Sequence, residues 1–457
     1  MTTRNRSTSL FDFYGRPPIL KALPLSLQHI LAMMMGTVTV PIIVVGAVNA
    51  SLDEKMALIQ IALIASGIST LLQLYCIGRM GARLPAIFGV GFAYVPTLTA
   101  IGAQYGISGI LGAQVAGGLA MMLVAVFIRH IRGLFTPVVA GTVVLVIGLS
   151  LYDIAINYMA GGVASSSRGS LLNWGIAIIT LLVVLGVSHF ARGFLQLASI
   201  ICGIAVGYVL SVFCGLVDFS PIAAAPWFTA PSPMQFELEF HTAAIISMVI
   251  ICVINSVQTI GDLSATTVGA MNRELSDREL SGGLLGNGVC TLLGSFFGAL
   301  PTASYSQNVG IVAMTKVISR FVLALAAGFM LVAGFIPKFG ALITTIPFPV
   351  LGGATIIVFG MITMTGIKLI TKEEMSSRNV TIVSLALALS MGIYAVPDAI
   401  AQFPEMLKLV VGGSPIVVAA FVAIVLNLIL PKKTLADEEQ ERLQIEMKMN
   451  GESQASR

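Results

Sequence analysis

The sequence has little charge. Only 10% of its 457 residues are Asp, Glu, Lys or Arg and 56% are hydrophobic, whereas soluble domains have about 25% charged residues. Such a chain cannot cover itself with a charged surface, which excludes a soluble globular protein and indicates a polytopic membrane protein. Tryptophan is also rare, with two residues against 46 glycines. So many small residues favour closely packed transmembrane helices.

Motifs of enzymes and metal sites are lacking as well. The five cysteines are scattered through apolar segments without a CxxC pair, which favours a packing role over a metal or disulfide role. The sequence contains no HExxH, no GxSxG and no nucleotide-binding loop with a lysine. We therefore expect no enzyme, no cofactor, no metal site and no nucleic-acid partner.

Apolar segments recur along the whole chain, and most approach the ~20 residues that a helix needs to cross a bilayer. We expect an all-α polytopic membrane protein with fourteen spans. The expected spans are residues 25–48, 57–77, 84–100, 107–128, 134–156, 171–190, 195–216, 241–261, 282–299, 301–315, 319–336, 341–366, 379–396 and 409–430. The third and the tenth are unusual, because they are short or interrupted by polar residues.

The basic residues support this number of spans. With a cytoplasmic N-terminus, only Lys55, Arg168, Lys338 and Lys408 of the 25 Lys and Arg residues fall outside. The positive-inside rule produces such a bias only if the number of spans is nearly right. Residues 1–22 lack the short apolar run and cleavage site of a signal peptide. We expect both termini in the cytoplasm and the protein in the cytoplasmic (inner) membrane.

The tenth span is polar in its first half, from Thr302 to Asn308. Polar or non-helical backbone at membrane depth survives only where protein encloses it or where it lines a cavity. Pro301 lacks an amide donor and Gly310 relaxes the backbone. We therefore expect an extended segment to about Ser306 and a helix from about Gln307, whose N-terminus lies at a central binding site.

Two pairs of segments are similar within the chain. Leu84-Pro85 opens the third span as Leu300-Pro301 opens the tenth, and the segment 137–141 opens the fifth as 349–353 opens the twelfth. Seven spans separate the members of each pair, and an odd number of crossings reverses orientation. This predicts two inverted seven-span repeats whose interrupted segments meet near the midplane.

Gln307, Asn308, Gly310, Thr315 and Lys316 fit the pattern Gln/Glu-Asn-x-Gly, four free positions, then Thr and a basic residue. The pattern resembles the signature of the nucleobase-ascorbate transporter (nucleobase/cation symporter-2) family, of the xanthine/uric acid permease type. The resemblance implies a core of spans 1–4 and 8–11 that moves against a gate of spans 5–7 and 12–14. It also implies short β-strands in spans 3 and 10 beside the substrate, and a homodimer formed through the gate.

The expected division of the chain follows from this resemblance. It comprises a cytoplasmic N-terminal segment (1–24), a first core segment (25–130), a first gate segment (131–216), an extracytoplasmic loop (217–240), a second core segment (241–338), a second gate segment (339–430) and a cytoplasmic tail (431–457).

Two candidate residues lie in the first and third spans. Gln28-His29 resembles a Gln-His pair of the family, which places His29 beside the site, where it can staple the packing or titrate near neutrality. By spacing alone, Phe92 is a core residue. The resemblance implies instead that Phe92, next to Gly91, stacks on the base ring of the substrate.

The eighth span carries a departure from the family. Its segment 258–262 resembles the family's Glu-Ser-x-Gly-Asp run, with Gln258 where a substrate-binding Glu is usual. Because glutamine cannot titrate, Asp262, four residues on and on the same helical face, is the candidate for cation coupling. The alternative is a carboxylate at the cytoplasmic end of the helix, paired with an arginine.

Two markers of specificity disagree. Asn287 in the ninth span is the residue type that uracil-type relatives have at this position, whereas Gln307 is the residue type that purine-type relatives have at its position. We give Gln307 more weight, because its amide would face the ligand while Asn287 supports the half-helix from behind. The expected substrate-binding residues are Gly91, Phe92, Gln258, Ser306, Gln307 and Asn308, and the expected coupling or supporting residues are His29, Asp262, Asn287, Gly310 and Thr315.

The resulting hypothesis is a secondary active transporter that imports a purine nucleobase of the xanthine/uric acid type by alternating access, with a proton as the coupled cation. One alternative is a uracil or other pyrimidine permease. Another is an anion carrier or channel on the same scaffold, although no Arg or Lys lies deep in spans 3, 8 or 10.

Overall fold

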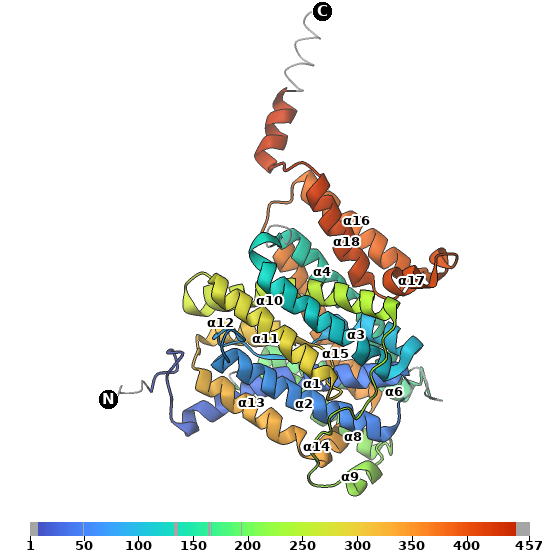
Figure 1. Cartoon of the computed structure of the whole chain (residues 1–457). Coiled ribbons are helices and arrows are strands. Elements are labelled where there is room, and N and C mark those ends of the chain that lie inside the picture. Colours follow the sequence, from blue (N-terminus) through green and yellow to red (C-terminus); the bar gives the residue numbers. More distant parts are fainter. Residues whose placement is uncertain are drawn as a thin grey trace, which may run out of the picture.

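Helices account for most of the chain (Figure 1). The computed structural model describes residues 8–48, 50–131, 136–162, 165, 167–192 and 194–444. Residues 1–7 of the expected N-terminal segment and 445–457 of the expected tail lie outside the described residues.

The first half of the chain forms α1 (Ile19–Val48), α2 (Leu52–Tyr75), β1 (Phe88–Val90), the 3-10 turn η1 (Phe92–Tyr94), α3 (Val95–Ile131), α4 (Pro137–Ser150), α5 (Tyr152–Met159), α6 (Leu171–Phe190), α7 (Phe194–Leu197) and α8 (Ser199–Phe213). The second half forms α9 (Ser220–Ala224), α10 (Thr242–Met271), α11 (Asp277–Ser295), β2 (Thr302–Ser304), α12 (Ser306–Thr315), α13 (Arg320–Gly334), α14 (Pro337–Thr344), α15 (Phe348–Ile370), α16 (Ser377–Ala395), η3 (Pro397–Ile400), α17 (Glu405–Leu407), η4 (Lys408–Gly412) and α18 (Pro415–Ile429).

Eight helical segments among the described residues are long and apolar enough to cross a membrane, or nine if the bent pair α13–α14 is one span. The number is below fourteen partly because α3 runs from the end of the third expected span through the fourth, with a break at Gly106 (φ 67°). In addition, α8 and α18 have 15 residues each, and α12 has 10. A mostly helical polytopic protein is therefore confirmed, and the fourteen crossings stay a prediction.

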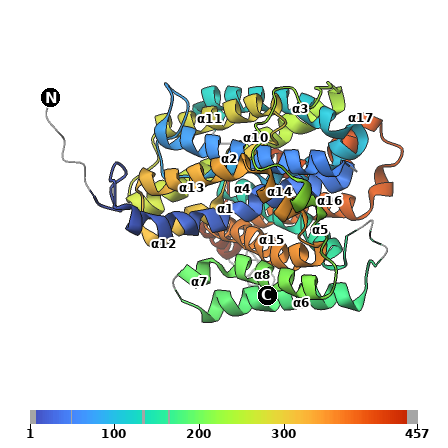
Figure 2. The same cartoon turned by 90° about the horizontal axis from the view of Figure 1, so that it is seen from below.

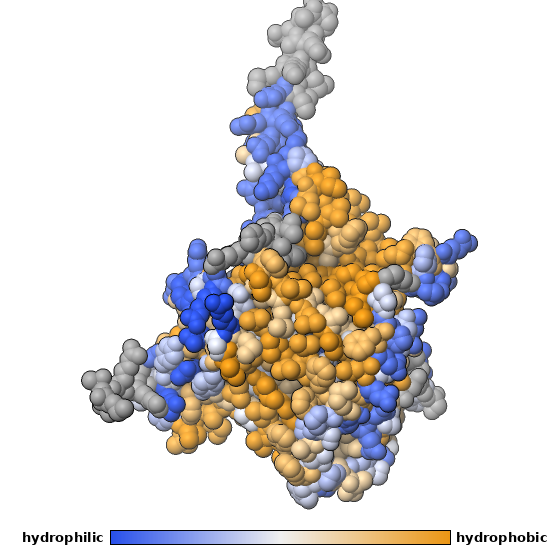
Figure 3. Space-filling model, in the orientation of Figure 1, coloured by the Kyte–Doolittle hydropathy of each residue, from blue (hydrophilic) through white to orange (hydrophobic). Residues whose placement is uncertain are grey.

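The surface agrees with a membrane setting. Figure 3 shows an apolar expanse across the middle of one face, with hydrophilic atoms gathered toward its left and right edges and along the tail. Large apolar side chains such as Leu171, Phe190 and Phe213 are almost fully exposed. Such exposure is unfavourable in water and suits contact with lipid. The chain is a multi-pass membrane protein.

The helices pack into two groups. The first group comprises α1, α2, α3, α10, α11, α12 and α13, and the second comprises α4, α5, α6, α8, α15, α16 and α18. Figure 2 shows α3 and α11 on one side of the molecule, α6 and α8 on the opposite side, and α15 between them.

The two unusual spans are both broken by a strand, and the strands pair with each other. β1 and β2 are antiparallel, with Gly89 opposite Ala303 at the centre and all six strand residues buried. α12 then begins at Ser306, so the predicted change from extended segment to helix is confirmed. Tyr305 fixes the junction, because its amide donates to the Ile87 carbonyl at 3.0 Å and its hydroxyl to the Val90 carbonyl at 2.8 Å.

Gly89 is required by this close packing. A Cβ atom at this position would lie 2.5 Å from Ser66 Oγ and 2.7 Å from Cε2 of the Tyr305 ring. We expect Gly89→Ala to lower the free energy of unfolding by about 2 kcal/mol, because overpacked sites force neighbours to move. The unfolding midpoint of the purified protein measures this effect. Gly175→Ala in α6, where a Cβ meets nothing within 4 Å, is the matched control, and an equal loss there would contradict the packing argument.

Candidate substrate-binding site

A cavity of about 550 Å³ lies between the two helix groups. The first group contributes residues of η1, α10, β2 and α12, and the second contributes residues of α4, α5 and α15. Its lining includes five of the six residues expected to bind substrate, namely Gly91, Phe92, Gln258, Ser306 and Gln307. Residues from three spans that are far apart in the sequence are thus brought to one place.

Phe92 provides an aromatic surface at the end of β1. It follows Gly91, whose amide donates to the Pro301 carbonyl at 3.3 Å, so the turn after β1 is tied to the start of the other broken span. The Phe92 ring meets the edge of Phe359 from α15, with ring centroids 5.3 Å apart and planes at 81°. This contact joins the first helix group to the second.

The N-terminus of α12 is the polar end of the cavity. Ser306 and Gln307 are its first two residues, and Tyr305 provides no side-chain cap. The first amides of a helix have no intrahelical acceptor and carry partial positive charge. Together with the carboxamide of Gln307, they can bind carbonyl oxygens of a ligand. The carboxamide of Gln258 supplies a further donor and acceptor from α10.

Asp262 lies behind the cavity wall. Its carboxylate accepts hydrogen bonds from Ser304 Oγ at 2.5 Å and from Ser306 Oγ at 2.7 Å. Asp262 is buried and is not a lining residue. Among the described residues its hydrogen-bond partners are the hydroxyl groups of Ser304 and Ser306 and the side chain of Gln258, and none is an arginine, so the expected alternative of an Arg-paired carboxylate is not what the structure places here. Asp262 therefore fixes the junction between β2 and α12.

The structure places Asn308 away from the cavity. Its side chain is buried, and its Nδ2 donates to the His29 carbonyl at 3.1 Å and lies 3.1 Å from His29 Nδ1. Asn308 was expected to bind substrate, but it does not line the cavity and joins α12 to α1 instead. His29 contacts α12 through Asn308, and its role beside a substrate site stays a prediction.

Three further expected supporting residues have different surroundings. Asn287 is buried behind β2, where Thr302 Oγ1 donates to its Oδ1 at 2.7 Å. Thr315 ends α12 and its hydroxyl bonds the Ile311 carbonyl at 2.8 Å. Gly310 lies inside regular helix, and a Cβ there would meet nothing within 4 Å. Relaxation of the backbone at Gly310, which the sequence suggested, is therefore not seen.

Residues of the second helix group were missed by the sequence reasoning. Tyr152 and Thr363 line the cavity, and the tyrosine hydroxyl donates to Thr363 Oγ1 at 2.7 Å. Lys368, in the last turn of α15, is the one charged residue among the described residues that line it. These side chains lie in strongly apolar segments or near helix ends, and no local pattern marks them as lining a cavity.

Comparison with known sequences identifies relatives along nearly the whole chain. A family model described as "Permease family" matches residues 20–399. The xanthine permease of Bacillus subtilis (strain 168) is 35% identical over 412 residues, which cover 90% of this chain and 93% of the relative. The uric acid permease PucK of the same organism is 36% identical, covering 89% and 95%. The xanthine permease XanQ of Escherichia coli (strain K12) is 32% identical, covering 93% and 94%.

Solved structures give a likeness of fold. The transmembrane domain of the cyanobacterial bicarbonate transporter BicA matches with a TM-score of 0.55 at 14% identity, over 90% of this chain and 98% of that one. Murine Slc26a9 in the inward-facing state matches with a TM-score of 0.58 at 11% identity, over 94% and 69%. At such identities the likeness concerns the fold alone. The family model and the relatives above 30% identity show that this chain belongs to the nucleobase-ascorbate transporter family of permeases.

Proposed function

We propose that this protein imports a purine nucleobase of the xanthine or uric acid type across the cytoplasmic membrane. One observation carries the proposal: a cavity between two helix groups brings the Phe92 ring and the carboxamides of Gln258 and Gln307 together at the broken spans. The names of the relatives, xanthine permease and uric acid permease, agree with a ligand of this kind.

The chemistry of the lining suits a flat heterocycle. Phe92 offers a face or edge to an aromatic ring, and two carboxamides can pair with alternating N–H and C=O groups on the edge of an oxidised purine. Each such hydrogen bond contributes about 1 kcal/mol, whereas micromolar affinity requires about 8 kcal/mol. Removal of the ring from water must therefore supply much of the remainder.

Transport by alternating access requires that one group of helices move against another. We assign the first helix group to the core (25–130 and 241–338) and the second to the gate (131–216 and 339–430), and we propose fourteen crossings in two inverted repeats. Support comes from the position of the cavity between the groups and from the paired strands in spans 3 and 10. The cavity extends to exposed Lys368 near the end of α15, which agrees with an inward-facing state and cytoplasmic termini.

The proposal also covers proton coupling and the homodimer. Asp262 is the buried carboxylate nearest to the site residues Ser304 and Ser306, and we assign proton coupling to it. The exposed apolar faces of α6 and α8 in the gate are where we place a homodimer contact, with lipid around the rest.

A competition experiment tests the substrate class. Uptake of labelled xanthine is measured in cells that express the protein and lack their own nucleobase permeases, with unlabelled urate, hypoxanthine, uracil or bicarbonate as competitors. We expect the purines to compete and uracil and bicarbonate to leave uptake unchanged. Competition by uracil at the concentrations at which urate competes would favour the pyrimidine permease, and competition by bicarbonate alone would favour the anion carrier.

Gln258→Glu tests the departure from the family. A glutamate at this position lines the cavity and can titrate, so we expect uptake of this variant to depend more steeply on pH between 5 and 8 than uptake by the parent protein. Initial uptake rates across this range measure the effect. An unchanged pH profile would show that position 258 does not face the permeating substrate.

A further inference from the structure

A second pocket shares no lining residue with the substrate cavity. It has a volume of about 280 Å³ and is formed by four segments that are distant in sequence: the N-terminal segment, the loop between α2 and β1, the end of α10 and the start of α11. We call it the arginine pocket, because Arg83, Arg273 and Arg278 line it together with Phe13 and Glu279.

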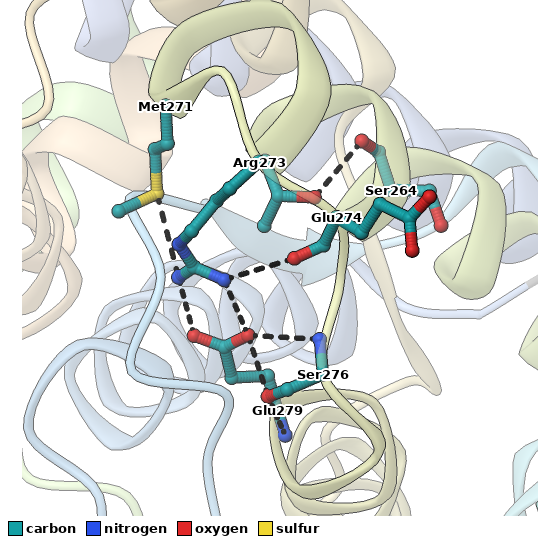
Figure 4. Close-up of polar contacts among 7 residues, drawn as sticks. Ser264, Met271, Arg273, Glu274, Ser276 and Glu279 are labelled. Atoms are coloured by element: carbon teal, nitrogen blue, oxygen red, sulfur yellow. Dashed lines mark hydrogen bonds and ion pairs between the residues drawn. The ribbon is translucent and has the colours of Figure 1, made fainter.

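The arginine pocket is lined by more positive than negative side chains. Glu279 binds the Arg273 guanidinium with both oxygens, at 2.8 and 2.5 Å, and accepts from the Ser276 hydroxyl at 2.7 Å (Figure 4). Burial raises the pKa of Glu279, but the hydrogen bonds from Arg273 and Ser276 outweigh it and hold this pKa below its usual range. The carboxylate is thus committed to Arg273. Arg83 and Arg278 are exposed, and neither forms an ion pair with any residue that the structure describes.

Strained backbone is concentrated around the same pocket. Five non-glycine residues among those described have positive φ. Cys76 and Arg83, both with φ 56°, line the pocket, and Asn272, with φ 50°, lies between two lining residues. Each such residue costs about 1 kcal/mol or more, and strain of this kind gathers at binding sites.

The strained loop is held in place from two sides. The Ala82 amide donates to the side-chain Oε1 of Gln73 at 2.8 Å, and the Arg83 amide donates to the main-chain carbonyl of Gln73, also at 2.8 Å. The Gly81 amide donates to the Gly282 carbonyl of α11, also at 2.8 Å. Arg83 is therefore presented at a fixed backbone position, and it lines the same pocket as Arg278 at the start of α11.

We propose that the arginine pocket binds a phosphate ester. Guanidinium groups match phosphate oxygens with two parallel hydrogen bonds, and two of the three are not committed to a carboxylate. The volume suits a phosphoryl group with a small organic moiety, since pockets for drug-sized ligands start near 300 Å³. Phe13 and Tyr14 form the apolar wall. The phosphate ester comes either from solution or from the headgroup of a phospholipid in the adjacent leaflet.

A phosphate ester bound in the arginine pocket would connect segments next to β1 and α10, which both lead to residues of the substrate site. Arg83 precedes β1 by five residues, and Arg273 follows the end of α10, which carries Gln258 and Asp262. A ligand held by both segments would stabilise the first helix group, because it binds the folded state alone.

The test measures thermal unfolding of the purified full-length protein in nanodiscs. The soluble probe is glycerol 3-phosphate added to phosphatidylcholine nanodiscs, and the lipid probe is phosphatidylglycerol incorporated in them. The variants are the double substitution Arg83→Gln with Arg278→Gln, and Lys372→Gln, a cation in the turn after α15 outside the pocket. No transport is measured, so the outcome does not depend on the proposed substrate.

We expect one of the probes to raise the unfolding midpoint, and which of them does so identifies the source of the phosphate. The double variant should need at least about tenfold more probe for the same shift, whereas Lys372→Gln should respond as the parent protein does. The proposal is overturned if neither probe stabilises the protein, if the double variant responds like the parent, or if Lys372→Gln loses as much.

Discussion

Replacement of Gln307 by alanine is expected to raise the KM for purine uptake roughly 100-fold. Gln307 lines the cavity at the first turn of α12, so its removal leaves groups on the edge of the enclosed base without a partner. Each unpaired buried polar group costs about 1–3 kcal/mol, and about 2.8 kcal/mol corresponds to a factor of 100. Initial rates of labelled xanthine uptake over a range of concentrations, normalised to the amount of protein in the membrane, measure the change.

A matched variant separates this effect from general damage. Gln104 is exposed on α3 and does not line the cavity, so Gln104→Ala should leave KM unchanged. If Gln307→Ala transports xanthine with the parent KM, Gln307 does not bind the substrate and the proposed site is wrong.

Asp262→Asn is expected to abolish accumulation of substrate against a gradient while exchange of substrate across the membrane continues. Asparagine keeps an oxygen that can accept from Ser304 or Ser306, so the junction between β2 and α12 persists. It cannot carry a proton. Asp262→Ala removes both acceptors and should abolish exchange as well, because both serine hydroxyls at the cavity lose their partner.

Proteoliposomes separate the two activities. Counterflow of labelled xanthine measures exchange, and uptake driven by an imposed pH gradient measures accumulation. Asp218→Asn is the control, since Asp218 is an exposed loop carboxylate that likewise accepts a serine hydroxyl, Ser220 Oγ at 2.7 Å. Full accumulation by Asp262→Asn would assign Asp262 to positioning alone.

The broken tenth span was predictable because its cause is local. A proline followed by a mostly polar segment between apolar runs cannot form an ordinary lipid-facing helix, and the observed β2 and α12 follow this pattern within one residue. The direction in which each side chain points was not fixed by the same pattern. Adjacent residues in a helix project about 100° apart, so Gln307 lines the cavity while Asn308 bonds to His29.

The opposite wall of the cavity could not be predicted from the sequence. Thr363 lines the cavity and Phe359 contacts the Phe92 ring, and both lie within an apolar helix, α15, whose position results from its packing against α4, α5 and α6. The continuity of the third and fourth expected spans in one helical segment could not be predicted either, for a local reason. Gly106 joins the third and fourth expected spans through a positive φ, a conformation that glycine adopts without cost and that composition does not reveal.

The β1–β2 pairing has a mechanical consequence. Three residue pairs fasten the two interrupted crossings to each other, so neither can shift alone without breaking its main-chain hydrogen bonds. The Phe92 ring and α12, which lie on either side of the proposed substrate position, must then move together as one rigid unit. In the proposed transport cycle the substrate would keep its contacts with the first helix group, and the wall contributed by α4, α5 and α15 would move relative to it.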